Sequence, residues 1–175
     1  AKAAEAGVTL AGVRKANARD LRAFADATFD AVLLMGPLYH LLDESDRQRA
    51  VNETVRVARP GGIVAATNIT RYAAIRWWAK HDPMQVVDHP AVYEEQIATG
   101  RTRDAVGFTD VYLMHPAELT ALFAGTGVEH VVTVACEGVV SMIHEKINAL
   151  EGEAWEHWAD LSYRLGKDPD RHGLA

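Results

Sequence analysis

Residues 29–62 limit the folds open to this chain more than any other stretch. A continuous apolar run over residues 29–35 ends at Gly36-Pro37, and a charged segment then leads to Arg-Pro-Gly-Gly at residues 59–62 and a second apolar run. A continuous apolar run between turn signals is typical of a strand that is covered on both faces. The order strand, helix, strand predicts an open α/β sheet, and such sheets bind ligands at the carboxyl ends of their strands.

The charged segment between the two runs predicts an amphipathic helix. Asp43 is expected to cap its N-terminus, where the helix dipole favours negative charge. Four apolar residues recur at helical spacing and predict the buried face: Ala50, Val51, Val55 and Ala58. Three charged residues are expected on the outer face: Arg47, Glu53 and Arg56.

The remaining segments predict a single domain over residues 1–175 with two additions. Residues 8–13 and 128–136 are predicted strands. Residues 70–109 mix short helical stretches with proline and glycine, which predicts an inserted helical cap. Apolar residues at helical spacing predict a helical appendage over residues 139–166.

The composition indicates a globular domain without affinity for polyanions. The 175 residues carry 18 Lys and Arg against 24 Asp and Glu, a net charge of -6, so nothing indicates binding to nucleic acid or to an anionic membrane. No apolar run approaches the ~20 residues of a membrane span. The single cysteine, Cys136, excludes an internal disulfide and favours the cytoplasm. A small-molecule partner is the default expectation.

Several of these segments, in this order, resemble the parts of class I S-adenosylmethionine (SAM)-dependent methyltransferases. Asn17-Ala18-Arg19-Asp20-Leu21 is similar to the family's loop after the third strand. Residues 29–36 resemble its fourth strand, Arg59-Pro60-Gly61-Gly62 the turn before its fifth, and His115-Pro116-Ala117-Glu118-Leu119 the helix before its sixth. The resemblance covers residues 1–138, and Gly-Pro-Leu-Tyr-His-Leu at residues 36–41 is typical of a bacterial subgroup that acts on small molecules.

The resemblance implies an α/β fold class: a Rossmann-like class I methyltransferase sheet in an incomplete, three-layer αβα arrangement with an inserted helical cap. The family's N-terminal Gly-rich SAM motif and its final strand have no counterpart in this chain, so only strands three to six are expected. Buried sheet edges would then lack partners. We therefore expect these residues to be part of a longer protein or, if the chain is complete, to exchange strands in a homodimer.

By the same resemblance, SAM is the expected cofactor and methyl donor. Asn17, Ala18 and Arg19 are expected near its adenine. The family usually has Asp at the position of Asn17, but an amide oxygen also accepts from the adenine amino group. Met35 and Gly36 are expected beside the methionine portion, because a residue without a side chain lets the backbone approach a ligand closely.

Tyr39 and His40 follow the strand end at which SAM and acceptor would meet. His40 is the candidate general base for direct in-line methyl transfer, because an imidazole with a pKa of ~6.5 suits proton transfer near neutrality. The alternative is a histidine at a helix start that bonds to backbone. Tyr39 is expected either to contact cofactor or acceptor, or to pack against the next helix.

The acceptor-binding candidates are four aromatic side chains and one carboxylate beyond the last predicted strand: Tyr72, Trp77, Phe108, Tyr112 and Glu137. Aromatic residues at helical spacing also build plain cores, and Glu137 also fits a solvated loop. His81-Asp82 and Asp88-His89 lack the spacing of a standard zinc site, so no metal is expected.

Two other classes of function stay open. A regulatory module could keep the fold and bind SAM or another ligand without catalysis, and the missing Gly-rich motif together with Asn17 favours this alternative. A nicotinamide-dependent oxidoreductase would need a Gly-x-Gly-x-x-Gly loop, which the sequence does not contain.

Overall fold

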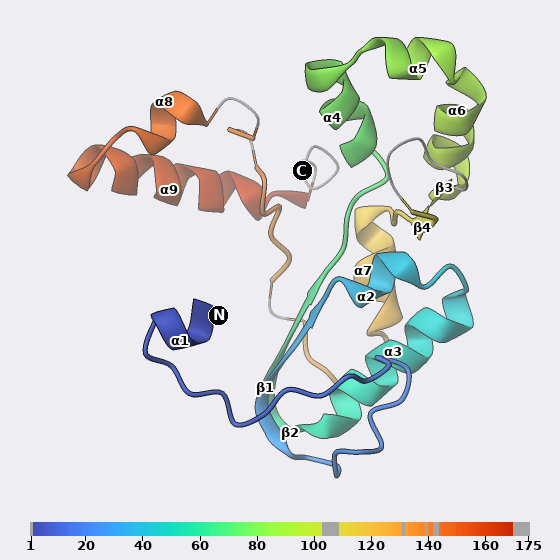
Figure 1. The fold of residues 1–175 in the computed structure, drawn as a ribbon, viewed down its shortest axis with the longest axis vertical. Helices are drawn as coiled ribbons and strands as arrows, with labels where there is room; N and C mark the ends of the chain where they lie inside the picture. The colour runs from blue at the N-terminus through green and yellow to red at the C-terminus, as the bar shows by residue number, and fades with distance from the viewer. Residues whose placement is uncertain (1, 103–108, 131, 139, 142–143, 170–175) are drawn as a thin grey trace.

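A parallel pair of strands forms the centre of the fold (Figure 1). The computed structural model describes residues 2–102, 109–130, 132–138, 140–141 and 144–169. Strand β1 (Phe29–Met35) pairs in parallel with β2 (Ala58–Thr67). The crossover between them consists of the one-turn helix α2 (Pro37–His40) and the longer helix α3 (Glu44–Val57). The predicted order of strand, helix and strand is therefore confirmed.

The boundary between α3 and β2 differs from the prediction. Helix α3 ends at Val57, and β2 begins at Ala58, so the Arg-Pro-Gly-Gly sequence lies inside the strand instead of before it. The register between the strands shifts at this point. Gly62 accommodates the shift, because a Cβ there would lie 2.9 Å from the carbonyl oxygens of both Arg59 and Asp30. Because the chain pairs with β1 from Ala58 onward, β2 begins before the glycines that were expected to precede it.

Helix α3 covers one face of the strand pair. The predicted apolar face is confirmed at Ala50 and Val51, which are fully buried and pack with Leu34 of β1 and Leu38 of α2. Asp43 does stand at the N-cap position, but its side chain makes no capping hydrogen bond. Its backbone carbonyl accepts from the N–H groups of Asp46 and Arg47.

The opposite face of β1 and β2 is open. Leu33, Met35 and Ile63 are 64%, 55% and 67% exposed, whereas Leu34 is 5% exposed. The prediction of a strand covered on both faces is therefore wrong for the described residues. Side chains alternate along a strand, so the helix that buries one set leaves the other set outside.

Two predicted strands do not form among the described residues. In the segment 8–13, Val8, Leu10 and Val13 are 55%, 57% and 85% exposed. The described part of segment 128–136 is likewise irregular, and its backbone reaches only Gly166, whose carbonyl accepts from the Ala135 N–H at 2.8 Å. A strand needs a partner strand for its row of N–H and C=O groups, and neither segment pairs with one among the described residues.

Short helices follow β2 and lie together beyond its carboxyl end (Figure 1). They are α4 (Ala73–His81), α5 (Met84–Asp88) and α6 (Pro90–Thr99). The chain then forms a small antiparallel pair, β3 (Arg101–Thr102) with β4 (Val111–Tyr112), before α7 (Pro116–Leu122) returns to the core through Leu122. The remaining helices are α1 (Lys2–Glu5), α8 (Glu145–Asn148) and α9 (Gly152–Gly166). Among the described helices, none combines the length and apolar character that crossing a membrane requires.

Gly100, at the end of α6, lies close to the backbone of Leu113, and a substitution there tests this contact. Its φ is +73°, and a Cβ at this position would lie 2.3 Å from the carbonyl oxygen of Leu113. Gly125 has nearly the same φ, +75°, but a Cβ there would meet no atom within 4 Å. We expect Gly100→Ala to lower the free energy of unfolding by about 1–3 kcal/mol more than Gly125→Ala, measured by urea denaturation. Equal losses would show that backbone strain alone matters.

Candidate functional site

The end of β1 forms a sharp turn that exposes two rings. Gly36 has φ 109° and ψ -46°, a conformation that residues with a Cβ rarely adopt, and Pro37 follows at the first helical position. The turn places the rings of Tyr39 and His40 side by side, with centroids 4.5 Å apart. A glycine is therefore needed here, because the turn requires a positive φ.

A cavity of about 720 Å³ lies beside this turn. Its walls come from the segment that precedes β1 and from α2 with the residue after it. The lining residues are Lys15, Ala16, Asn17, Ala18, Arg19, Pro37, His40 and Leu41. Its size is within the range of small-molecule sites, about 300–1,000 Å³. The fold thus brings the predicted adenine loop, Asn17 to Arg19, to the same cavity as the predicted base, His40.

Asn17 and Arg19 form a closed local turn. The side-chain oxygen of Asn17 accepts from the backbone N–H of Arg19 at 3.0 Å and from its Nε at 3.1 Å. Because a backbone N–H can only donate, these contacts fix which end of the amide is oxygen. The oxygen that was expected to accept from a ligand is therefore already engaged with Arg19.

Helix α3 holds this loop from the other side. The Arg19 guanidinium forms an ion pair with Asp46 in the first turn of α3. Asp46 also accepts from Arg49 at 3.3 Å. The loop and the helix are thus joined by charged contacts at the mouth of the cavity.

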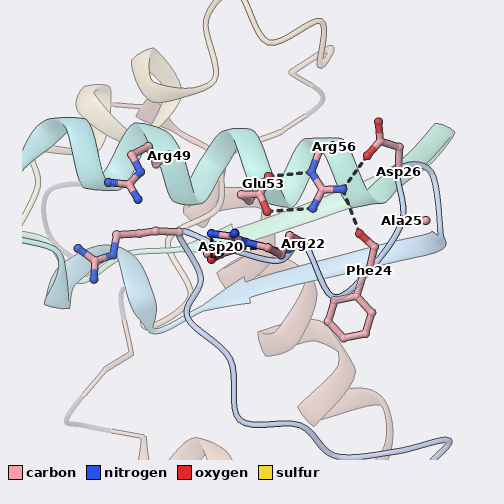
Figure 2. Close-up of a pocket in the computed structure, with 9 residues that line it drawn as sticks. Asp20, Arg22, Phe24, Ala25, Asp26, Arg49, Glu53 and Arg56 are labelled. Carbon is pink, nitrogen blue, oxygen red and sulfur yellow. Dashed lines mark hydrogen bonds and ion pairs between the residues drawn. The ribbon is translucent and has the colours of Figure 1, made fainter.

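A second cavity, of about 450 Å³, lies between the next part of the loop and α3 (Figure 2). Its lining is mostly charged: Arg19, Asp20, Arg22, Phe24, Ala25, Asp26, Arg49, Glu53 and Arg56. Each of the four arginines already contacts a carboxylate. Carboxylates of the protein therefore already neutralise the positive charge of this cavity, so the cavity is a poor site for an anion.

Glu53 and Arg56 hold the loop to α3 (Figure 2). Glu53 accepts from the backbone N–H of Leu21 at 2.5 Å and from Arg56 at 2.7 and 2.9 Å. Arg56 in turn donates to the carbonyl of Phe24 at 3.0 Å and to Asp26 at 2.6 Å. We call this pair the α3 clamp, because it ties residues 21–26 to the helix.

Hydrogen bonds to the arginines shift the titration of two carboxylates here. The hydrogen bond from Arg56 lowers the pKa of Glu53. The side-chain and backbone hydrogen bonds from Arg22 lower the pKa of Asp20 to about 2. Both groups are therefore ionised at neutral pH and keep their contacts with the arginines.

The other predicted cofactor residues are close in sequence to residues that line the first cavity. Met35 is 55% exposed at the end of β1. Gly36 precedes the lining residue Pro37, and Tyr39 precedes the lining residue His40. Neither Gly36 nor Tyr39 lines the cavity itself. The hydroxyl oxygen of Tyr39 lies 3.6 Å from the position that a Cβ on Gly36 would occupy.

The predicted acceptor residues that the structure describes do not line either cavity. Tyr112 lies with its ring 3.7 Å from the guanidinium carbon of Arg47. Tyr72 stands at the N-cap of α4, and Trp77 is 52% exposed. Glu137 is exposed and accepts from Ser141 at 3.0 Å. Phe108 is outside the residues that the structure describes.

The His81-Asp82 pair makes only local contacts among those described. The Nδ1 atom of His81 lies 2.8 Å from the carbonyl oxygen of Trp77, and the two rings stack with centroids 3.9 Å apart. Asp82 accepts from the backbone of Met84 and from Gln85 at the start of α5. Within the described ranges, no three His, Cys, Asp or Glu side chains form a group that could hold a metal ion.

The sequence reasoning missed the residues that position the site. Glu53 and Arg56 are expected on the outer, solvated face of the helix, yet they hold the loop. Their opposite charges at a spacing of three residues indicate an ion pair, but nothing in the sequence indicates that the pair reaches Leu21 and Phe24. The expectation for Arg47 is wrong: it is 5% exposed, because it points to the inner side of α3.

Comparison with known proteins supports the fold. Residues 1–66 match the family model described as a methyltransferase domain. A SAM-dependent methyltransferase from Methanosarcina mazei is similar in structure, with a TM-score of 0.52, 18% identity and coverage of 74% of this chain and 59% of that chain. A SAM-dependent methyltransferase from Thermotoga maritima, described as a possible histamine N-methyltransferase, has a TM-score of 0.46 and 21% identity. This match covers 73% of this chain and 49% of the Thermotoga maritima chain.

The similarity to the Methanosarcina mazei structure confirms the predicted α/β, Rossmann-like fold. The match to the family model confirms the resemblance to the methyltransferase family over residues 1–66. The chain spans 59% and 49% of the lengths of the two solved structures.

The α3 clamp predicts a stability that depends on pH. A carboxylate whose pKa is lowered in the folded state stabilises the protein above its ordinary pKa, and this contribution is lost as the pH falls through the folded value. We expect Glu53→Gln to lower the free energy of unfolding by about 1 kcal/mol at pH 7. The difference from the wild type is expected to shrink below the ordinary pKa of 4.5.

The measurement is urea denaturation at a series of pH values. Glu94→Gln, at an exposed position of α6, is the matched control and is expected to show no such trend. A stability difference that stays constant between pH 7 and pH 3 would contradict the role of the Glu53 carboxylate.

Proposed function

We propose that this protein transfers the methyl group of SAM to a small-molecule acceptor by direct in-line displacement. One observation carries the proposal: the cavity of about 720 Å³ is lined by Asn17, Ala18, Arg19 and His40. All four lie within the residues that match the methyltransferase domain model. The position at the carboxyl end of a parallel strand agrees with the place where open α/β sheets bind ligands.

The lining of the cavity fits the cofactor. Ala16, Ala18 and Leu41 give apolar surface for a flat base, and Asn17 gives an amide. Gly36, with its positive φ, adds no side chain of its own at the strand end where the methionine portion would lie. When bound, SAM supplies a methyl group on a sulfonium, which is already activated for displacement. The protein then has mainly to align the acceptor and to exclude water.

His40 is the proposed general base. It ends α2 and lines the cavity, so its imidazole can take a proton from an acceptor hydroxyl, ammonium or acidic carbon. Tyr39, whose ring lies beside that of His40, is proposed to contact cofactor or acceptor. Met35 completes the proposed cofactor contacts at the end of β1.

For the acceptor, the proposal is that residues 70–109 form a cap over the single domain. Residues 139–166 are proposed to form a helical appendage. Acceptor contacts are assigned to Tyr72, Trp77, Phe108 and Glu137. Tyr112 is not assigned one, because its ring packs on Arg47. The proposal also includes a cytoplasmic location, which the single Cys136 favours, and a homodimer.

A second candidate is a module that binds SAM or another ligand without catalysis. The engagement of the Asn17 oxygen by Arg19 favours this candidate, because it removes one expected acceptor for the adenine amino group. The two candidates differ in whether SAM is turned over, and the following experiments separate them.

The cofactor assignment predicts binding of S-adenosylhomocysteine, the product of methyl transfer. Isothermal titration calorimetry is expected to show binding to the wild type. We expect Asn17→Ala to weaken the affinity about tenfold, because the substitution opens the turn that holds Arg19 at the cavity. Asn52→Ala, at an exposed position of α3, is expected to leave the affinity unchanged. A wild type that binds neither SAM nor S-adenosylhomocysteine would contradict the proposal.

The role of His40 predicts a loss of turnover without a loss of binding. We expect His40→Gln to reduce methyl transfer by about 100-fold or more, because a positioned general base contributes about 10²–10⁴ to the rate. The affinity for S-adenosylhomocysteine should change less than about twofold. Turnover is measured as S-adenosylhomocysteine release with a panel of small amines, phenols and acids. His130→Gln is the control, and full activity of His40→Gln would rule out the base.

A further inference from the structure

A buried arginine lies directly behind the turn that carries His40. Arg47 of α3 is only 5% exposed. Its Nη1 atom donates to the carbonyls of Leu41 at 2.7 Å and Leu42 at 2.9 Å, the two residues that follow His40. Burying a guanidinium is costly unless its N–H groups are satisfied, so these bonds fix the backbone at the end of α2.

The face of this guanidinium packs on Tyr112. The guanidinium carbon of Arg47 lies 3.7 Å from the ring centroid, within the range of a cation–π contact. Tyr112 belongs to β4, which contacts α2 (Figure 1). Its hydroxyl donates to Glu118 at 2.8 Å. Burial and this hydrogen bond raise the pKa of Tyr112, so the hydroxyl keeps its proton.

From Glu118 the contacts continue to the helices beyond β2. The other carboxylate oxygen of Glu118 pairs with Arg71 at 2.5 Å. Arg71 donates to the carbonyls of Ile97 at 3.3 Å and Ala98 at 3.5 Å, in the last turn of α6. Gln96, 1% exposed, donates back to the Arg71 carbonyl at 2.6 Å.

None of these side chains lines either cavity. They have no direct access to a ligand there, and any effect on chemistry must pass through the backbone that they hold. Hydrogen bonds are directional, so a displacement of α6 changes the contacts of Arg71 and, through Glu118 and Tyr112, those of Arg47.

We propose that Arg47, Tyr112, Glu118 and Arg71 form a positioning network that couples the placement of the His40 turn to that of helix α6. The structural coupling stands on the contacts alone, while its consequence for catalysis rests on the proposed role of His40. The network holds the imidazole in one orientation only while α6 is in place. Residues 73–99 thereby control the geometry of the reaction without touching the cavity.

Tyr112→Phe is the sharpest variant, because it removes one oxygen and keeps the ring on Arg47. Tyr163→Phe, on α9 and 51% exposed, is the matched control. Hydrogen–deuterium exchange of the full chain is followed in peptides from the His40 turn (36–43), from the end of α6 (94–102) and from β1 (29–35). We expect Tyr112→Phe to raise exchange about fivefold in the first two peptides and not in the third. An increase confined to one of the two peptides, or shared equally by β1, overturns the coupling.

The ring resonances of His40 report its orientation without any substrate. They are assigned by their absence in His40→Gln. The coupling predicts that Tyr112→Phe and Arg47→Lys both shift these resonances, and that Tyr163→Phe and Arg164→Lys, both on α9, do not. Unshifted resonances in both network variants would overturn the proposal.

A kinetic comparison separates this inference from the proposed function. With an acceptor found by screening, Tyr112→Phe is expected to lower kcat about tenfold, with the KM for SAM and the affinity for S-adenosylhomocysteine within about twofold of wild type. If the wild type shows no turnover at all, the proposed function fails, whereas exchange and resonance data still decide the coupling.

Discussion

The parallel pairing of β1 with β2 sets the position of every element around the proposed site. Two parallel strands cannot be joined by a tight turn, so the chain must cross over, and α2 and α3 make that crossing. The burial of Ala50 and Val51 of α3 against Leu34 and Leu38 then sets the distance between helix and sheet. The turn at Gly36 follows the carboxyl end of β1, and residues 15–19 of the segment before β1 line the same cavity as Pro37 and His40.

Helix α3 contributes none of the side chains that line the cavity beside His40, yet it positions both of its walls. On its outer side, Asp46 and the α3 clamp hold the loop that contains Asn17 and Arg19. On its inner side, Arg47 holds the backbone after His40. A single rigid element thus relates the proposed cofactor loop to the proposed base, and a site supported in this way keeps its geometry better than one built on loops alone.

The open face of the sheet and the charged loop have opposite characters. Leu33, Met35 and Ile63 remain more than half exposed, because the described elements cover only one side of the strand pair. The loop before β1, in contrast, contains few apolar residues in the core and is held almost entirely by ion pairs and hydrogen bonds to α3. Its conformation therefore depends on charge states, as the lowered pKa values of Asp20 and Glu53 indicate.

Local periodicity, turn chemistry and a family resemblance were sufficient to predict three features: the order of strand, helix and strand, the glycine turn at residue 36, and the grouping of Asn17 to Arg19 with His40. Packing, in contrast, selected the segments that became strands. Residues 8–13 and 128–136 have the composition of strands, but strand formation needs a partner strand, and neither segment pairs with one among the described residues. Packing also buried Arg47 and placed its guanidinium on the ring of Tyr112. Contacts between residues so far apart in the chain have no local signature, since they arise only when the folded elements come together.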